Sequence, residues 1–419
     1  MAATIIADQL TKRYRIGKGL TSLRELFAFN RQSATRTYHW AVRDVSFQLE
    51  PGDALGIIGP NGAGKTTILK LLSRVSHPSS GALHVDGRLS ALIELGAGFH
   101  PDLTGRENIY LNGTILGMRR AEIKSRFDEI VAFAGIGHYL DTPVKRYSSG
   151  MYARLGFAIA AHVDPQVLLV DEVLAVGDYA FQMKCYARMA ELRRNGTTLI
   201  FVSHNMEAVR RVCERGLVMY RGQAIFQGSA AEAVVAYSDA IRDAARQSQD
   251  TTTPQEDGLS QRVMTFDAEI ERVQLLDAAG DAVSVLRTGA PAHLAVDVRF
   301  NRAVAHPIFS LIIRAQDGRV LYDTTTQWRK IVTPTFAAGE RCRVEYALQM
   351  PLLEGSYELG IDIASADLTH FYDCLERALT FSVVGAKGAE GVVDLGATIA
   401  INKIAAPESP SPTYAMAAS

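Results

Sequence analysis

The chain has 419 residues, of which 47% are hydrophobic and 21% charged, and its formal net charge at pH 7 is −1. That length is enough for two or three domains, each with its own hydrophobic core. A charge balance this close to neutral argues against a nucleic-acid-binding protein, and the four widely spaced cysteines favour neither a zinc site nor a disulfide framework.

The chain shows no targeting or membrane-spanning pattern. Its first residues lack a basic segment followed by an apolar core, and no uninterrupted apolar stretch is long enough to span a bilayer. We therefore expect the protein to remain in the cytoplasm, or to reach a membrane only through a partner.

The first part of the chain, residues 1–241, alternates apolar runs of strand length with helical patterns. This alternation is typical of an α/β domain with a largely parallel sheet.

The strongest motif follows an apolar run, residues 54–58, that reads as a buried strand. Residues 59–66 match the pattern G-x-x-x-x-G-K-[ST], in which glycines let successive backbone N–H groups form an anion-binding nest. A helix that opens at Lys65 would direct its positive dipole end at the phosphates of a nucleoside triphosphate. We expect Lys65 to reach the β- and γ-phosphates and Thr66 to offer a hydroxyl to Mg²⁺. The nucleotide-binding residues predicted from this motif are Gly59, Pro60, Asn61, Gly62, Ala63, Gly64, Lys65, Thr66 and Thr67.

An aromatic side chain upstream of this loop is expected to cover the adenine ring, because adenine needs a flat apolar face. Tyr14 is the first candidate. Tyr38 and Trp40, which close a basic insertion that begins at Gly17, are the alternatives.

Two later apolar runs end in residues suited to nucleotide hydrolysis. The run 167–170 ends in Asp171, which can hold Mg²⁺, and Glu172, which can polarise a water molecule for attack on the γ-phosphate. The run 198–203 ends in His204, which is well placed to hydrogen-bond the γ-phosphate. A histidine at a strand end is more often structural when it stands alone, so this role depends on the motifs around it.

A second anion site is predicted between the phosphate loop and Asp171. Ser148, Ser149 and Gly150 open a predicted helix that includes residues 152–161. The nucleotide held by the phosphate loop of the same chain does not need this second site. We therefore expect two copies to face each other head to tail, so that each covers the ATP held by the other.

The motifs together resemble those of nucleotide-binding subunits of ABC transporters. Residues 59–66 match the Walker A loop, residues 167–171 the Walker B strand and residues 147–151 the signature motif. The positions that match the catalytic glutamate, the D-loop aspartate and the switch histidine are Glu172, Asp178 and His204. The resemblance implies an α/β ABC ATPase domain, a P-loop NTPase with a RecA-like core plus a helical subdomain. It also implies ATP and Mg²⁺ as cofactors, a homodimer and a separate transmembrane permease.

Departures from the general pattern narrow the subfamily. Ser149 stands where the signature motif usually has glycine, and Met151 stands where it usually has glutamine. The glutamine that couples the γ-phosphate to the permease is replaced by Glu94 or Leu95, and the sequence leaves both open. These variants resemble the subfamily that exports polysaccharides, which includes the ATPase subunits for O-antigen and teichoic acid.

The second half of the chain has a different pattern. Residues 242–262 are polar and nearly free of large apolar side chains, which is typical of a linker. Alternating polar and apolar residues then predict short strands, which together indicate an all-β sandwich over residues 263–386. The C-terminal extension, residues 387–419, is expected to be disordered after residue 404. The expected strands are 269–276, 292–300, 308–315, 319–323, 341–346, 357–363 and 378–384.

The short runs of the second domain resemble the carbohydrate-binding domain of O-antigen exporters that handle end-modified chains. That resemblance implies recognition of the glycan terminus. An aromatic face flanked by hydroxyl and amide groups suits a sugar ring, and the candidates of this kind are Tyr322, Thr326, Gln327 and Trp328. Burial of Trp328 in the core is an equal alternative, whereas we expect Tyr346 and Tyr357 to be buried.

The sequence thus predicts the ATP-hydrolysing subunit of an ABC transporter that exports a lipid-linked polysaccharide of the O-antigen type. The resemblance places it at the cytoplasmic face of the inner membrane through its permease, with no nucleic acid as partner. An exporter of teichoic acid or another polyol phosphate polymer is one alternative. A soluble ABC ATPase outside transport is the other, although such proteins usually carry two cassettes and one phosphate loop is present here.

Overall fold

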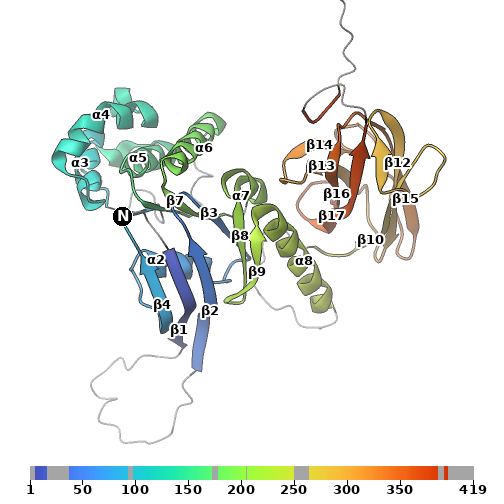
Figure 1. Cartoon of the computed structure of the whole chain (residues 1–419), viewed down its shortest axis with the longest axis horizontal. Coiled ribbons are helices and arrows are strands. Elements are labelled where there is room, and N and C mark those ends of the chain that lie inside the picture. The colour runs from blue at the N-terminus through green and yellow to red at the C-terminus, as the bar shows by residue number, and fades with distance from the viewer. Residues whose placement is uncertain are drawn as a thin grey trace, which may run out of the picture.

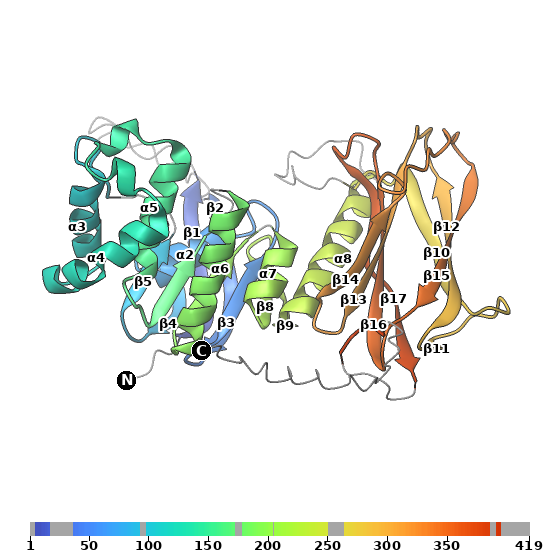
Figure 2. The same ribbon diagram turned by 90° about the horizontal axis from the view of Figure 1, so that it is seen from above.

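The computed structural model shows an α/β domain followed by a β-sandwich (Figure 1, Figure 2). Helix α8 (Ala230–Gln249) lies between the two domains in both views.

Among the helices that the structure describes, none is long and apolar enough to cross a membrane. All four cysteines carry free thiols. The structure describes residues 5–16, 37–92, 98–171, 178–203, 205–249, 264–385 and 391–394.

The centre of the first domain is a six-stranded sheet in the order β5-β6-β7-β3-β8-β9. Its strands pair in parallel except for β8 with β9. Side chains alternate between the two faces: Leu55 and Ile57 belong to one buried cluster, and Ala54 and Ile58 to another. Burial on both faces explains why these strands read as continuous apolar runs. Their bounds are β3 Ala54–Ile58, β5 Leu89–Leu92, β6 Val167–Val170, β7 Thr198–Val202, β8 Arg215–Tyr220 and β9 Gln223–Ser229.

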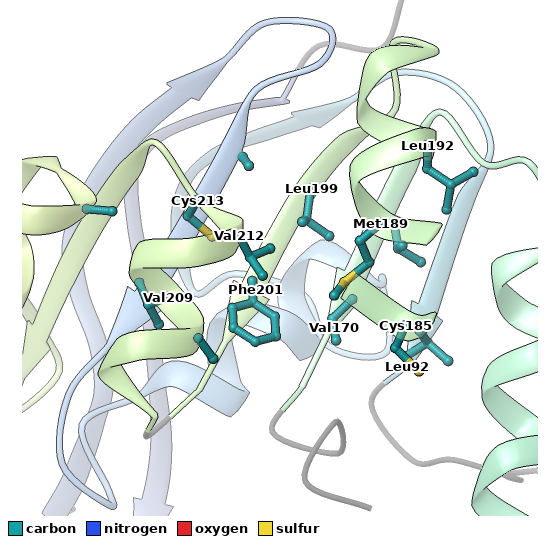
Figure 3. Close-up of a cluster of buried hydrophobic side chains, with 14 of the residues drawn as sticks. Leu92, Val170, Cys185, Met189, Leu192, Leu199, Phe201, Val209, Val212 and Cys213 are labelled. Atoms are coloured by element: carbon teal, nitrogen blue, oxygen red, sulfur yellow. The ribbon is translucent and has the colours of Figure 1, made fainter. Parts of the chain in front are cut away.

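Helices α6 (Tyr179–Arg194) and α7 (Met206–Val212) cover one face of this sheet. Figure 3 shows Met189 of α6 and Val209 of α7 in the same buried layer as Phe201 of β7. The other face packs against α2 and a three-stranded antiparallel sheet in the order β2-β1-β4. The bounds of these elements are α2 Lys65–Leu72, β1 Ile5–Ile16, β2 Thr37–Leu49 and β4 Ser80–Val85.

A helical subdomain with its own hydrophobic cluster stands beside the six-stranded sheet (Figure 1). Thr104 begins its first helix through a capping box with Glu107, and Gly135, in the left-handed region, ends its second. These local signals define the helix ends, and apolar side chains such as Ile123 and Leu155 fill the space between the helices. The helices are α3 Gly105–Ile115, α4 Arg120–Ala134 and α5 Ser149–Ala161, with 3₁₀ turns η1 Gly137–Tyr139 and η2 Val144–Arg146.

The second domain consists of a three-stranded sheet, β10-β12-β15, and a five-stranded sheet, β11-β17-β16-β13-β14. Both contribute to one hydrophobic cluster, with Leu294 and Val296 from the first sheet and Leu359 and Ile361 from the second. The predicted all-β sandwich is therefore confirmed. The bounds are β10 Ala268–Leu276, β11 Val285–Arg287, β12 Ala290–Phe300, β13 Ile308–Ala315, β14 Val320–Thr325, β15 Arg341–Met350, β16 Gly355–Ala364 and β17 Phe371–Val384.

Two strands differ from the expectation. Strand β11 has three residues, which is too short for an alternating pattern to be recognised. Strand β17 begins at Phe371, seven residues before the predicted start at 378. Its first half contains Asp373 and Glu376, both buried against arginines of other elements, so this half does not read as an amphipathic strand.

The polar segment after residue 241 is not a linker over its whole length. Residues 242–249 form the last turns of α8, whereas the sequence analysis assigned them to the linker. Arg242 pairs with Asp373 and Arg246 pairs with Glu269, so the polar face of these turns meets charges of the second domain. Residues 250–263 lie outside the described residues, and the other domain limits stay predictions.

One buried amide supports the entry to the helical subdomain. The side chain of Asn108 is fully buried and donates to the carbonyl oxygens of His100, Leu103 and Thr104, while it accepts a hydrogen bond from the backbone N–H of His100. We expect Asn108→Ala to destabilise the domain by about 3 kcal/mol, because these groups would lose a buried partner. Urea unfolding followed by circular dichroism measures the effect.

Arg106→Ala is the matched control for this variant, because Arg106 pairs with Asp141 at the exposed surface of the same helix. It should leave the unfolding midpoint almost unchanged. Equal midpoints for the two variants would show that the buried amide is not what holds this segment.

Candidate functional site

The phosphate loop borders a pocket of about 270 Å³ between β3 and the start of α2. Residues from the loop, from β1 and β2 and from the end of β6 line it. The pocket thus brings together segments that are far apart in the sequence. The lining residues are Tyr14, His39, Ala41, Asn61, Gly62, Gly64, Lys65, Thr66, Thr67 and Asp171.

Two glycines allow the loop to pass close to neighbouring backbone. A Cβ atom at Gly59 (φ 154°) would lie 2.1 Å from the carbonyl oxygen of Met219, and one at Gly64 (φ 103°) would lie 2.2 Å from that of Ala41. Any other residue at these positions would clash and would also be strained. The conformation of the loop therefore requires glycine at both ends.

Lys65 is buried at the first position of α2, where its ammonium group donates to the carbonyl oxygens of Gly59 (2.7 Å) and Pro60 (2.8 Å). The preceding N-cap residue, Gly64, provides no side-chain cap. A buried ammonium beside the start of a helix makes this end of the pocket electropositive. The pocket is therefore suited to phosphate groups.

Thr66 and Asp171 both line the same pocket, one on the first turn of α2 and the other directly after β6. A hydroxyl and a carboxylate oxygen are ligands of the kind that Mg²⁺ accepts next to nucleotide phosphates. The residues present thus fit a magnesium ion held together with a nucleotide. Mg²⁺ would supply charge neutralisation for the phosphates when bound.

The structure separates the three aromatic candidates for the adenine ring. Tyr14 lines the pocket, and 42% of its surface is exposed. Tyr38 and Trp40 do not belong to the lining residues, and the guanidinium of Arg13 lies over both rings, at 4.6 and 5.6 Å from their centroids. The geometry favours Tyr14.

Sequence reasoning missed His39 and Ala41 in this pocket. His39 lies directly opposite Tyr14 in the β1–β2 pairing. The signal would have been the strand register: residues 13–16 pair without a shift with residues 40–37, but the strand ends Ile16 and Thr37 from which to count are not marked in the sequence.

The predicted second anion site lies apart from this pocket. Ser148 is the N-cap of α5 and accepts a hydrogen bond from the backbone N–H of Met151, and Ser149 beside it is exposed. Neither these serines nor Gly150 is among the lining residues of the phosphate pocket. An exposed helix start at a distance from its own loop is what completion by a second copy requires.

Tyr147, the first residue of the signature motif, is half-buried, and its hydroxyl donates to the carbonyl oxygen of Tyr139 at 2.8 Å. Burial, with a smaller contribution from Asp141, raises the pKa of this phenol. Tyr147 therefore stays a neutral hydrogen-bond donor, and its bond to Tyr139 holds the residues directly before α5 in place.

Asp178 is the N-cap of α6 and accepts a hydrogen bond from the backbone N–H of Phe181 at 2.8 Å. Its other carboxylate oxygen lies 3.9 Å from Arg154 of α5. Arg154, which sequence reasoning did not single out, thus links the signature helix to the predicted D-loop aspartate.

Several predicted residues lie outside the described part of the chain: Glu172, His204, Glu94 and Leu95. Val202, at the end of β7, pairs with Ile57 of β3. The predicted roles of Glu172 and His204 stay predictions.

The four glycan candidates lie in β14 and the turn that follows it. Trp328 is 63% exposed, which excludes the core alternative, and Gln327 beside it is exposed as well. Thr326 is buried, and its hydroxyl accepts a hydrogen bond from the backbone N–H of Phe309, so it serves the fold. The hydroxyl of Tyr322 accepts a hydrogen bond from Arg329 at 2.7 Å. Of the other aromatics, Tyr357 is buried and Tyr346 half-buried.

The turn that presents Trp328 is held by hydrogen bonds on both sides. The backbone N–H of Trp328 donates to the hydroxyl of Thr325, and that of Ile331 donates to the carbonyl of Thr326. Ile331 and Val332 are 58% and 85% exposed. The turn therefore presents an ordered apolar surface to solvent.

The fold and the phosphate pocket define an ABC-type ATPase with an appended β-sandwich. Comparison with known families agrees: residues 42–175 match the family described as ABC transporter, and residues 260–395 match the one described as Wzt C-terminal domain. The O-antigen export system ATP-binding protein RfbB of Myxococcus xanthus is 41% identical over 407 residues, which cover 94% of this chain and 92% of that protein. The chain therefore belongs to the family of O-antigen export ATP-binding proteins.

Two further relatives align with a little more than half of this chain. A Klebsiella pneumoniae protein of the same name is 42% identical over 247 residues, which are 58% of this chain and all of that protein. The teichoic acids export ATP-binding protein TagH of Bacillus anthracis is 38% identical over 236 residues, 56% of this chain and 42% of its own length.

Tyr14→Ala tests the adenine assignment. Loss of one aromatic stacking contact, worth about 1 kcal/mol, should raise the KM for ATP roughly fivefold and leave kcat nearly unchanged. Steady-state ATPase assays measure both constants. Trp40→Ala is the control and should behave as the wild type; a larger KM increase for Trp40→Ala than for Tyr14→Ala would reverse the assignment.

Proposed function

We propose that this ATPase drives export of a lipid-linked polysaccharide of the O-antigen type, as a homodimer bound to a separate transmembrane permease. The observation that carries the proposal is the 41% identity to an O-antigen export relative over 94% of this chain, a span that includes both domains. The protein then works at the cytoplasmic face of the inner membrane through the permease.

The proposed ATP site is completed by two copies of the chain. The separation of Ser148 and Gly150 from the phosphate pocket supports this arrangement. ATP then closes the dimer, and hydrolysis reopens it. One copy supplies Lys65, Thr66, Asp171, Glu172 and His204, and the other supplies Ser148, Ser149, Gly150 and Asp178.

The β-sandwich is proposed to recognise the glycan terminus. The Klebsiella relative aligns over its full length with 58% of this chain, so this chain is considerably longer than that relative. The exposed turn around Trp328 supports its use as a binding surface. The O-antigen export relative from Myxococcus xanthus is matched over 94% of this chain and the TagH relative over 56%, which favours O-antigen over teichoic acid as the type of polymer.

Glu172→Gln tests the catalytic role of that carboxylate. Because a glutamine cannot accept a proton from water, ATP turnover should fall by at least about 100-fold while ATP binding persists. Size-exclusion chromatography with ATP and Mg²⁺ should then show a stable dimer. Glu129→Gln, at an exposed position of α4, is the control; full turnover by Glu172→Gln would refute the assignment.

Trp328→Ala tests the glycan surface. Binding of the source organism's own polysaccharide to the full chain, measured by calorimetry, should weaken by at least about tenfold, because the aromatic face is lost. The circular dichroism spectrum and Tm should be unchanged, since Trp328 is 63% exposed. Val285→Ala removes another exposed apolar side chain of the sandwich and should leave binding intact; equal affinities for both variants would place the glycan elsewhere.

A further inference from the structure

Four charged side chains meet between α7 and the sandwich. Glu207 and Arg210 lie on α7, whereas Arg314 lies on β13 and Glu376 on β17. One carboxylate oxygen of Glu376, Oε2, lies 3.2 Å from the guanidinium of Arg210 and 3.0 Å from that of Arg314. Oε1 of Glu207 lies 3.3 Å from Arg210 and 4.0 Å from Arg314. The four residues, called the latch below, form a closed ring in which acids and bases alternate and each domain supplies two.

Three of the four latch residues are buried where the two domains meet. The side chains of Arg210 and Arg314 are each 4% exposed, and that of Glu376 is 10% exposed. A charge this deeply buried is unfavourable without an opposite charge beside it. Arg210 is paired with a buried carboxylate that belongs to the other domain, so the first domain by itself does not supply this environment.

The backbone around the latch leaves room for the two guanidinium groups. A Cβ atom at Gly360 of β16 would lie 2.8 Å from a terminal nitrogen of Arg314. A Cβ atom at Gly318, in the turn between β13 and β14, would lie 3.1 Å from Cδ of Arg210. Both positions hold glycine, so the sheet and the turn fit closely around these side chains.

A second contact fixes the sandwich to α8. The guanidinium of Arg242 donates two hydrogen bonds of 2.8 Å to the carboxylate of Asp373, which is fully buried and also accepts from the backbone N–H of Ile270. Ile241 of α8 and Phe266 belong to one small hydrophobic cluster at the same place. The sandwich is thus attached to two helices of the first domain, α7 and α8.

Helix α7 begins beside the phosphate loop. Val202, at the end of β7, pairs with Ile57, two residues before the first residue of the loop, Gly59. The hydroxyl of Ser203 then accepts from the backbone N–H of Asn205, whose side chain caps α7. A change in the segment beside the nucleotide phosphates therefore reaches Arg210 through a single helix of seven residues.

We propose that the latch couples the nucleotide site to the sandwich: occupancy of the phosphate pocket shifts α7, and α7 carries the five-stranded sheet with it through Arg210 and Glu376. Because such coupling is reciprocal, a ligand on the sandwich changes the affinity for ATP by the same factor. The proposal depends on ATP binding by the first domain and not on the identity of the polymer.

Hydrogen exchange of the full chain, with and without Mg²⁺ and a non-hydrolysable ATP analogue, tests the proposal. In the wild type the analogue should protect residues 59–72 and also change exchange in residues 308–325 and 371–384. In Glu376→Gln the two guanidinium groups lose their buried carboxylate and keep only that of the 55% exposed Glu207, so exchange in both sandwich segments should rise by at least about tenfold. Protection of residues 59–72 should persist, and the response of the sandwich to the analogue should be lost.

Two more variants keep the test decisive. Glu207→Gln changes the member of the latch that is 55% exposed, so it should fold even where Glu376→Gln does not, and it should show a reduced sandwich response. Asp297→Asn breaks the pair with Arg343 on the three-stranded sheet and should respond as the wild type does. Protection of residues 59–72 without any change in the wild-type sandwich, or a full response in both latch variants, would overturn the coupling. Absence of protection at residues 59–72 would instead contradict ATP binding itself.

Discussion

The close packing of the phosphate loop between two sheets is the constraint on which the first domain depends. Gly59 lies against the carbonyl of Met219 in the six-stranded sheet, and Gly64 lies against that of Ala41 in the antiparallel sheet. The backbone N–H of Gly222 donates to the carbonyl of Ala63 in the middle of the loop. The loop holds its conformation only when both sheets are in place, so the anion-binding geometry is a property of the whole domain and not of the motif alone.

The elements that carry this geometry could be predicted from the sequence because they are buried on both faces. Strands β3, β6 and β7 read as continuous apolar runs, and the polar residues that follow them mark the edge of the sheet where the pocket lies. The position of Tyr14 could be predicted only as one of three candidates. The choice among them depends on which ring borders the pocket, and this leaves no local pattern in the sequence.

Most strands of the second domain could be predicted from alternation, but its attachment to the first domain could not. Arg314 and Glu376 are charged residues within strands, and their burial depends on partners more than a hundred residues away in α7. The same reason applies to the end of α8. The polar residues 242–249 are helical, and Arg242 among them pairs with the buried carboxylate of Asp373. Long-range charge pairing overrides local composition at each of these places.

Helix α8 belongs to both domains, with Val234 in the core of the first and Ile241 in the cluster beside the second. Its 20 residues form one continuous rod. Each residue of an α-helix turns the following side chain by about 100° and advances it by about 1.5 Å. A single insertion between Val234 and Ile241 would thus point Arg242 away from Asp373. When sandwiches are exchanged between relatives to alter which polymer is handled, the helical phase of α8 must be kept along with the sandwich.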